Sequence, residues 1–243
     1  MRARHMQRLA RATGLPTPAD VTRDELFKWA GAQTWQTETR RSYYQTFRAF
    51  WAVAVREGHA INNVAADLPV VHMTTPDARP TPYRVYRHSL MLAEPRERLM
   101  LRLSAEAGMR RGEVAQAHSS DLIEDDDGWW IRVHGKGGRD RTVPLLDDLA
   151  SELCVLGTGY FFPGRHGAGH LTPGHVGFLI GRLFDDHTMH QLRHMFGTRT
   201  YRVKRDLFVV QALLGHASPV TTRRYVKTRH EDLRSTVEAA QYD

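Results

Sequence analysis

Residues 128–145 read GWWIRVHGKGGRDRTVPL. WWIRVH is rich in β-branched and aromatic side chains, GKGGRD is a glycine-rich turn, and RTVPL is a second short run of strand-forming residues. Two such runs around a turn are typical of a β-hairpin. Most of the remaining sequence has helical patterns. We therefore predict a mainly α-helical protein with a small β-hairpin or sheet, an α+β fold.

The turn of this hairpin contains Lys136 between glycines, whereas the other lysines of the chain are only Lys28, Lys204 and Lys227. Arginine is the usual cation of this sequence and does not readily release a proton, so lysine at this position indicates a proton donor. A solvated turn lysine is the alternative interpretation.

The sequence AGMRRGEVAQ, residues 107–116, precedes the hairpin. A helical pattern runs from Ser89 to Ala107, and Gly108 can end that helix in a left-handed conformation. A second helix is predicted to begin near Arg111. Arg110 then lies at the junction of the two helices, where Glu113 can hold its guanidinium in position.

Helical spacing also dominates the N-terminal part of the chain. Apolar side chains recur along Thr39 to Gly58, and shorter helices are predicted at Thr22 to Ala32 and Met6 to Thr13. Met73 to Pro82 is rich in Pro, Thr and Asp, which favours an exposed linker. These patterns divide the chain into a helical domain at residues 1–75, a linker at 76–82 and a second domain at 83–243.

The composition restricts the class of protein. The 243 residues have a net charge of +7, and the only cysteine is Cys154, so one chain can form neither a disulfide nor a thiolate zinc cluster. No apolar run approaches the roughly 18 residues of a membrane span, and we expect a cytoplasmic protein. Between Asp186 and Arg229 only Asp186 and Asp206 are acidic, which indicates a phosphate-facing surface or a solvated cationic helix face. The basic residues of that stretch are Arg193, Arg199, Arg202, Lys204, Arg205, Arg223, Arg224, Lys227 and Arg229.

The segment HQLRH runs from His190 to His194, and Thr188 before it is a suitable helix N-cap. His190 and Arg193 are three residues apart and share a helix face, so an imidazole and a guanidinium can bind one phosphate together. His190 and His194 also have the spacing of a zinc-binding helix. The sequence supplies neither an HExxH glutamate nor an obvious third ligand for that alternative.

The segment DLFVVQALLGHASPV, residues 206–220, follows. Asp206 can cap a helix that Gly215 ends, and Ser218-Pro219 can begin the next one. His216 is therefore predicted in a tight corner between helices, where it can serve a reaction or simply satisfy a carbonyl at the helix end.

The segment TTRRYVKTR, residues 221–229, surrounds Tyr225 with cations. Positive charge stabilises a phenolate, which is a competent nucleophile toward phosphorus. A half-buried packing tyrosine is the alternative interpretation.

In this order, GMRRGE, the lysine hairpin, HxLRH, LLGH and a tyrosine nine residues later strongly resemble the tyrosine recombinase, or phage integrase, family. The resemblance extends from about Ser89 to Lys227. Glu113 matches an acidic structural support of the family. The positions that match its catalytic residues are Arg110, Lys136, His190, Arg193, His216 and Tyr225.

The resemblance implies that Tyr225 attacks a DNA phosphodiester, giving a 3′-phosphotyrosyl link and a free 5′-hydroxyl. Arg110 and Arg193 would neutralise the non-bridging oxygens, and Lys136 would protonate the leaving oxygen. His190 would assist deprotonation of the tyrosine. His216 would donate to a phosphate oxygen, and no metal or other cofactor is required.

The resemblance also implies partners. The first domain resembles the family's core-binding (SAM-like) domain, which clamps duplex DNA with the catalytic domain. From where the chain begins we expect a small form without a separate arm-binding domain, acting at simple core attachment sites with a possible directionality factor. Leu233, Val237 and Ala240 form an apolar stripe on a predicted tail helix, which either docks on a neighbouring protomer of a tetramer on two DNA sites or packs within the chain. The cations that we predict to contact DNA are Arg40, Arg41, Arg139, Arg199, Arg223 and Arg224.

Integration or excision of a prophage or mobile element is the first expectation for the biological role, and chromosome-dimer resolution stays open. A type IB topoisomerase would use similar chemistry to relax supercoils. A helical DNA-binding regulator would bind DNA without covalent capture.

Overall fold

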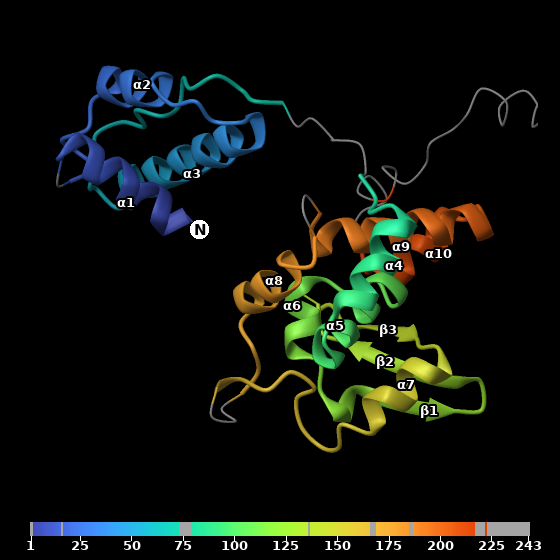
Figure 1. Ribbon diagram of the computed structural model, residues 1–243. Coiled ribbons are helices and arrows are strands. Elements are labelled where there is room, and N and C mark those ends of the chain that lie inside the picture. Colours follow the sequence, from blue (N-terminus) through green and yellow to red (C-terminus); the bar gives the residue numbers. More distant parts are fainter. Residues whose placement is uncertain are drawn as a thin grey trace, which may run out of the picture. The chain divides into compact units, whose positions relative to one another are not determined.

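The helices predicted near the N-terminus form a unit of their own. The structure is a computed structural model, and it describes residues 2–15, 17–72, 79–135, 137–165, 169–184, 187–216 and 222. The chain divides into two units, Met1–Pro76 and Asp77–Asp243. The first contains α1 (Arg2–Thr13), α2 (Arg23–Gly31) and α3 (Thr37–Arg56) (Figure 1).

The core of the first unit is built on the apolar face of α3. Phe47 and Trp51 are completely buried there, together with Leu26 of α2 and Leu9 of α1. The indole Nε1 of Trp51 donates to the carbonyl of Pro18 at 3.1 Å, so the polar atom of this ring is satisfied within the core. The apolar face of this predicted amphipathic helix therefore forms part of the core.

The second unit begins with two helices where the sequence pattern predicts one. The helix predicted from Ser89 to Ala107 is wrong in this respect, because α4 (Tyr83–Leu92) ends before α5 (Pro95–Glu106) begins. Proline disfavours helical backbone in the residue before it and is tolerated in the first turn of a helix. Glu94 is accordingly extended, with φ −61° and ψ 157°, and acts as the N-cap of α5.

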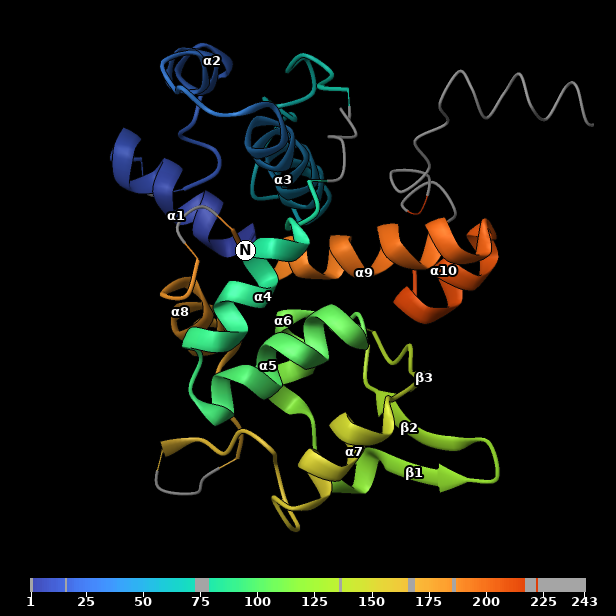
Figure 2. The same ribbon diagram turned by 45° about the vertical axis from the view of Figure 1, so that its right-hand side comes forward.

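A three-stranded antiparallel sheet follows the short α6 (Arg111–Gln116) and the 3₁₀ turn η1 (Ser119–Asp121). The predicted hairpin is confirmed as β2 (Gly128–Val133) and β3 (Arg141–Pro144), and β1 (Leu122–Asp125) adds a strand that the sequence analysis missed. Ile131 of β2 is completely buried, and α7 (Asp147–Cys154) packs on this strand (Figure 2).

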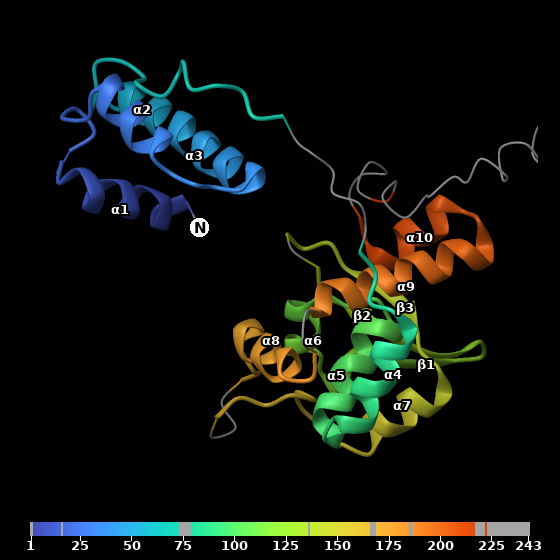
Figure 3. The same cartoon turned by 45° about the horizontal axis from the view of Figure 1, so that its top comes forward.

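Three further helices complete the described part of the second unit. They are α8 (Pro173–Gly181), α9 (Met189–Lys204) and α10 (Leu207–Leu214). The long α9 packs along α5, α8 packs against α6, and α10 contacts both α9 and β3 (Figure 3). A mainly helical fold with one small sheet is confirmed.

Capping residues begin and end α10 where the sequence indicates. Asp206 accepts hydrogen bonds from the backbone N–H groups of Phe208 and Val209, and Gly215 follows α10 in the left-handed conformation with φ 60°. The helix predicted after Ser218-Pro219 and the apolar tail stripe of Leu233, Val237 and Ala240 lie outside the described residues. Within the described ranges, no helix combines the length and apolar character needed to cross a bilayer.

Candidate active site

Arg110 lies at the junction between α5 and α6, as the sequence predicts. Gly108 has φ 63°, and a Cβ atom there would come within 2.6 Å of the Phe196 ring of α9, so only glycine fits this turn. Arg110 is the N-cap of α6. Its backbone N–H donates to Glu113 Oε2 at 2.7 Å and its Nη1 donates to Glu113 Oε1 at 2.6 Å. The side chain of Arg110 is nevertheless 41% exposed, so one end is anchored while the rest faces solvent.

Glu113 is the buried centre of an ionic cluster, which we call the Glu113 cluster and which contains Glu113, Arg110, Arg141 and Arg193. The Glu113 side chain is only 5% exposed. Arg141 of β3 donates to both of its oxygens, at 3.1 Å and 2.8 Å, and Arg193 Nη1 lies 3.7 Å from Oε2. The carboxylate therefore links α6 with the sheet and with α9.

The electrostatics of this cluster keep Glu113 ionised. Burial alone would raise the pKa of Glu113, but the hydrogen bonds and charge of Arg141, followed by the hydrogen bonds of Arg110, lower it to about 2. An ionised carboxylate is the form that accepts from arginine, so the orientation of Arg110 is fixed over the whole neutral range.

Arg141 is a site residue that the sequence analysis missed. Its Nε donates to the carbonyl of Leu213 at 2.8 Å, and a Cβ atom on Gly215 would come within 2.8 Å of its Cδ. The glycine before His216 thus makes room for this arginine. The available signal was an arginine at the start of a strand beside buried Val143, but a strand pattern cannot show that the side chain turns back toward a glutamate 28 residues earlier.

Arg193 lies in the second turn of α9 and is 1% exposed. Its guanidinium donates to the backbone carbonyls of Gly108 and Leu214. It therefore connects the helix junction beside Arg110 with the end of α10. His190 lies one turn earlier and is exposed, and its ring centroid is 4.3 Å from that of His194 in an edge-on arrangement. The shared face predicted for His190 and Arg193 thus has one residue at the surface and one in the interior.

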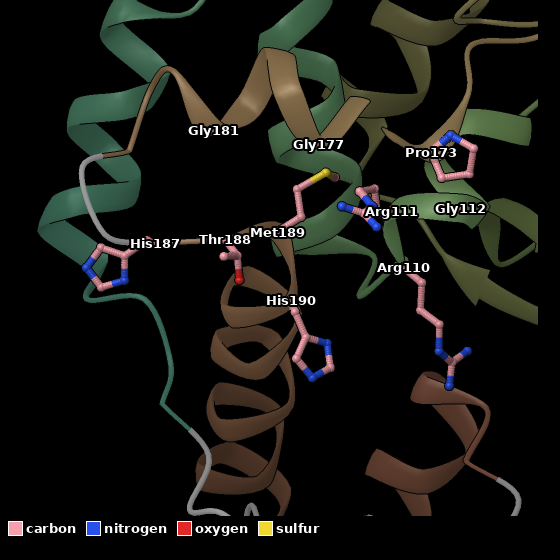
Figure 4. A pocket seen from close by; sticks show the side chains of 10 residues that line it. All are labelled: Arg110, Arg111, Gly112, Pro173, Gly177, Gly181, His187, Thr188, Met189 and His190. Carbon is pink, nitrogen blue, oxygen red and sulfur yellow. The ribbon is translucent and has the colours of Figure 1, made fainter. Parts of the chain in front are cut away.

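A cavity of about 550 Å³ lies between α6, α8 and the start of α9. Figure 4 shows the Arg110 and His190 side chains on the same side of this cavity and Arg111 directed toward Gly177. A Cβ atom on Gly177 would come within 2.6 Å of Arg111, so the glycine allows this close packing. The remaining lining residues are Gly112, Pro173, Gly181, His187, Thr188 and Met189.

His216 directly follows Gly215, which ends α10 as predicted, whereas the second helix of the predicted corner lies outside the described residues. Its backbone N–H donates to the carbonyl of Gln211 at 3.2 Å, and its carbonyl accepts from Gln211 Nε2 at 3.1 Å. Its Nδ1 lies 3.0 Å from the hydroxyl of Thr222, which is completely buried. The position of this imidazole is therefore set by both backbone and side-chain contacts.

Lys136 and Tyr225 lie outside the described residues, so their predicted places in the site stay predictions. The residues around Lys136 form a tight turn. Gly137 and Gly138 have φ 78° and 72°, and a Cβ atom on Gly135 would come within 2.1 Å of the carbonyl oxygen of Arg139. The glycines of GKGGRD are thus required by the turn itself.

The predicted DNA-contacting cations have varied surroundings. Arg40 and Arg139 are exposed, Arg41 pairs with Glu38 at 3.5 Å, and the Arg199 guanidinium lies 4.8 Å from the centroid of the Tyr83 ring. Arg223 and Arg224 lie outside the described residues.

The zinc alternative lacks a complete ligand set in the described part of the chain. Among those residues, no group of three or more His, Cys, Asp or Glu side chains is arranged to hold a metal ion.

The family model described as the phage integrase family matches residues 87–156 and 177–232, more than half of the chain. The chain belongs to the phage integrase family. A curated relative, the tyrosine recombinase XerC of Rhodospirillum centenum, is 32% identical to this integrase-family chain over 232 residues, which cover 83% of the chain and 65% of the relative.

Solved structures of integrases have the same fold. A lambda integrase (75-356) dimer bound to a COC′ core site has a TM-score of 0.72 at 20% identity, covering 99% of this chain and 90% of that chain. A lambda integrase tetramer bound to a Holliday junction has a TM-score of 0.69 at 21% identity, covering 89% of this chain and 71% of that chain. This integrase-family chain spans only 45% to 65% of the length of the first curated relatives that it matches.

Proposed function

We propose that this integrase-family chain is a site-specific DNA recombinase that cleaves and rejoins DNA through a 3′-phosphotyrosyl intermediate. One observation carries the proposal: Arg110, held by a buried carboxylate, lines the same cavity as His190. Such a site binds an anion and orients it, which is what phosphoryl transfer requires of a protein.

The proposed chemistry needs a nucleophile and an acid. The Tyr225 oxygen forms a bond to the scissile phosphorus while the bond from phosphorus to the 5′ oxygen breaks. Lys136 gives a proton to that leaving oxygen, and His190 takes the proton of the phenol. The phosphotyrosyl link conserves the bond energy, so the reverse attack by a 5′-hydroxyl rejoins DNA with no nucleotide cofactor.

The arginines and His216 stabilise the charge that develops on the phosphate. Arg110 presents its exposed guanidinium edge to one non-bridging oxygen, and such a donor contributes on the order of 3 kcal/mol to the transition state. His216 donates to a phosphate oxygen. Arg193 neutralises the second non-bridging oxygen, and this contact requires a rotation of its guanidinium, because two of its nitrogens donate to backbone carbonyls and the side chain is 1% exposed.

We further propose that the partner is duplex DNA at core attachment sites, with the helical first unit as the core-binding domain. The net charge of +7 supports a polyanionic partner. Assembly as a tetramer on two sites, with a possible directionality factor, extends the likeness to the lambda integrase tetramer. The reaction is integration or excision of a prophage or mobile element in the cytoplasm.

Covalent capture tests this function. The protein is incubated with sheared genomic DNA of its source, the DNA is denatured in SDS, and the sequences joined to protein are mapped. The mapped site is then rebuilt as a duplex with a nick beside the scissile phosphate, so that the released fragment diffuses away and the adduct accumulates. We expect an adduct from the wild type and from the control variant Tyr201→Phe, but not from Tyr225→Phe.

The other interpretations predict different results. DNA retention without any adduct supports a binding regulator and refutes the recombinase. An adduct with relaxation of supercoils but no strand exchange between two mapped sites supports a type IB topoisomerase.

A further inference from the structure

His134 is held between two carboxylates at the end of β2. Its Nε2 lies 2.9 Å from Asp121 Oδ1 and its Nδ1 lies 2.9 Å from Asp140 Oδ2. Asp121 belongs to η1 and is buried, and its other oxygen accepts the backbone N–H of His118 at 3.2 Å. We call these three side chains, His134, Asp121 and Asp140, the His134 bridge.

The His134 bridge closes the turn that contains Lys136 in the sequence. His134 and Asp140 immediately flank residues 135–139, and their side chains are joined across the base of the turn. The backbone is in close contact at the same level, where a Cβ atom on Gly135 would be 2.1 Å from the Arg139 carbonyl oxygen. Through Asp121 the bridge also attaches the turn to η1, so a shift of the base of the turn would break the hydrogen bond between the half-exposed His134 and the buried Asp121.

The geometry of the bridge favours the imidazolium form. A neutral imidazole has one N–H donor, whereas two ionised carboxylates at hydrogen-bond distance require a donor on each ring nitrogen. The hydrogen bond to Asp121 raises the pKa of His134, burial lowers it by less, and Asp140 raises it further. Because the folded pKa is raised above its usual value near 6.5, the bridge is complete below that value and is lost as the pH rises through the folded pKa.

Other titratable groups face the same polar cavity of about 340 Å³. They are His118, whose Nδ1 lies 2.9 Å from the Ser120 hydroxyl, and Tyr160 and His170, which are in edge-on ring contact with each other. His170 Nδ1 lies 2.6 Å from the carbonyl oxygen of Leu171, outside the bridge. His170 therefore offers a matched control for a change of charge at His134, because it faces the same cavity without belonging to the bridge.

We propose that His134 is a positioning residue for DNA cleavage, holding the turn so that Lys136 can protonate the leaving 5′ oxygen. This inference rests on the proposed function. The inference assigns to His134 an effect on protonation of the leaving 5′ oxygen, and this effect is lost at alkaline pH. A purely structural histidine would produce neither result.

The test measures single-turnover cleavage of the nicked duplex at the mapped site with two leaving groups. One substrate has the ordinary 5′ oxygen and the other has sulfur in its place. A thiolate is a far weaker base than an alkoxide and leaves without a proton, so a defect in proton donation disappears on the sulfur substrate.

We expect His134→Gln to slow cleavage of the oxygen substrate by about 10-fold at pH 7, part of the 10²–10⁴-fold that a general acid contributes. We expect the same variant to cleave the sulfur substrate at the wild-type rate and to bind DNA with unchanged affinity. His134→Arg supplies two donors at every pH, so it should retain the wild-type rate at pH 7 and exceed it at pH 9. The control His170→Gln should cleave both substrates at the wild-type rate.

The outcomes separate this inference from the function on which it rests. If the wild type forms an adduct but His134→Gln slows cleavage of both substrates equally, or slows neither, the positioning role of His134 is refuted and the proposed function is not. A Lys136→Ala defect that persists on the sulfur substrate refutes Lys136 as the acid and the inference with it. Failure of the wild type to form any adduct refutes the proposed function and therefore also the inference.

Discussion

Glu113→Gln should destabilise the second unit by about 3 kcal/mol. Two independent arguments lead to this magnitude. The folded pKa of Glu113 is about 2 compared with its usual 4.5, and one pH unit corresponds to about 1.4 kcal/mol, which gives about 3 kcal/mol. Removing one partner of a buried ion pair costs about 3–5 kcal/mol, and glutamine still accepts one hydrogen bond, so the lower end applies.

Urea-dependent hydrogen exchange measures this loss locally. Peptides from α6 and β3 report the free energy of opening around the Glu113 cluster without interference from the first unit. The exposed Glu124 of β1 provides the control Glu124→Gln, which should change that free energy by less than about 0.5 kcal/mol. Arg141→Met combined with Glu113→Gln should cost less than the sum of the single changes, because the double variant leaves fewer buried charges uncompensated.

The pH dependence gives a second measurement of the same effect. The folded pKa of Glu113 is lowered, so its ionised form stabilises the fold above pH 4.5, and this contribution is lost as the pH falls from 4.5 toward 2. The wild type should therefore lose more stability than Glu113→Gln across that window. A Glu113→Gln variant within about 1 kcal/mol of the wild type, with the same loss on acidification, would refute this account of the cluster.

Three further changes test how local sequence positions the site. Gly108→Ala should destabilise the second unit by more than the roughly 1 kcal/mol that a left-handed alanine costs, because the added Cβ meets Phe196. The control Gly58→Ala, at φ 77° with no atom within 4 Å of the added Cβ, should cost the first unit only that conformational energy. Hydrogen exchange of each unit measures the two losses of stability, and equal losses would contradict the steric argument. Asp206→Ala removes the N-cap of α10 and should lower the protection of its amides by about 1 kcal/mol, with unchanged α10 exchange as the contrary result. Phe47→Ala should cost about 3–5 kcal/mol in urea unfolding of the first unit while α9 keeps its protection; a loss below about 1 kcal/mol would show that this core collapses around the cavity.

Much of the local structure could be predicted because short-range chemistry determines it. The β2–β3 hairpin follows from two strand-forming runs around glycines that must adopt positive φ. The start of α10 follows from Asp206, and its end follows from Gly215. Each of these features depends on residues that are close to one another in the sequence.

The errors occurred where a local pattern was ambiguous. A continuous helical periodicity from Ser89 to Ala107 concealed the break before Pro95, although proline before a helical turn is itself a local signal. β1 was missed because its sequence, LIED, has only four residues and two acids, and it becomes a strand by pairing with β2.

The sequence by itself determined the family, the helical character and which residue types are available to hold a phosphate, since motif order, periodicity and charge are properties of the linear chain. Only the tertiary structure decided that Arg141 and Arg110 share Glu113, that Arg193 is buried against two carbonyls, and that His134 bridges two aspartates. These contacts join residues up to 85 positions apart. Their energies depend on burial and on simultaneous partners, which exist only after the helices and the sheet have packed.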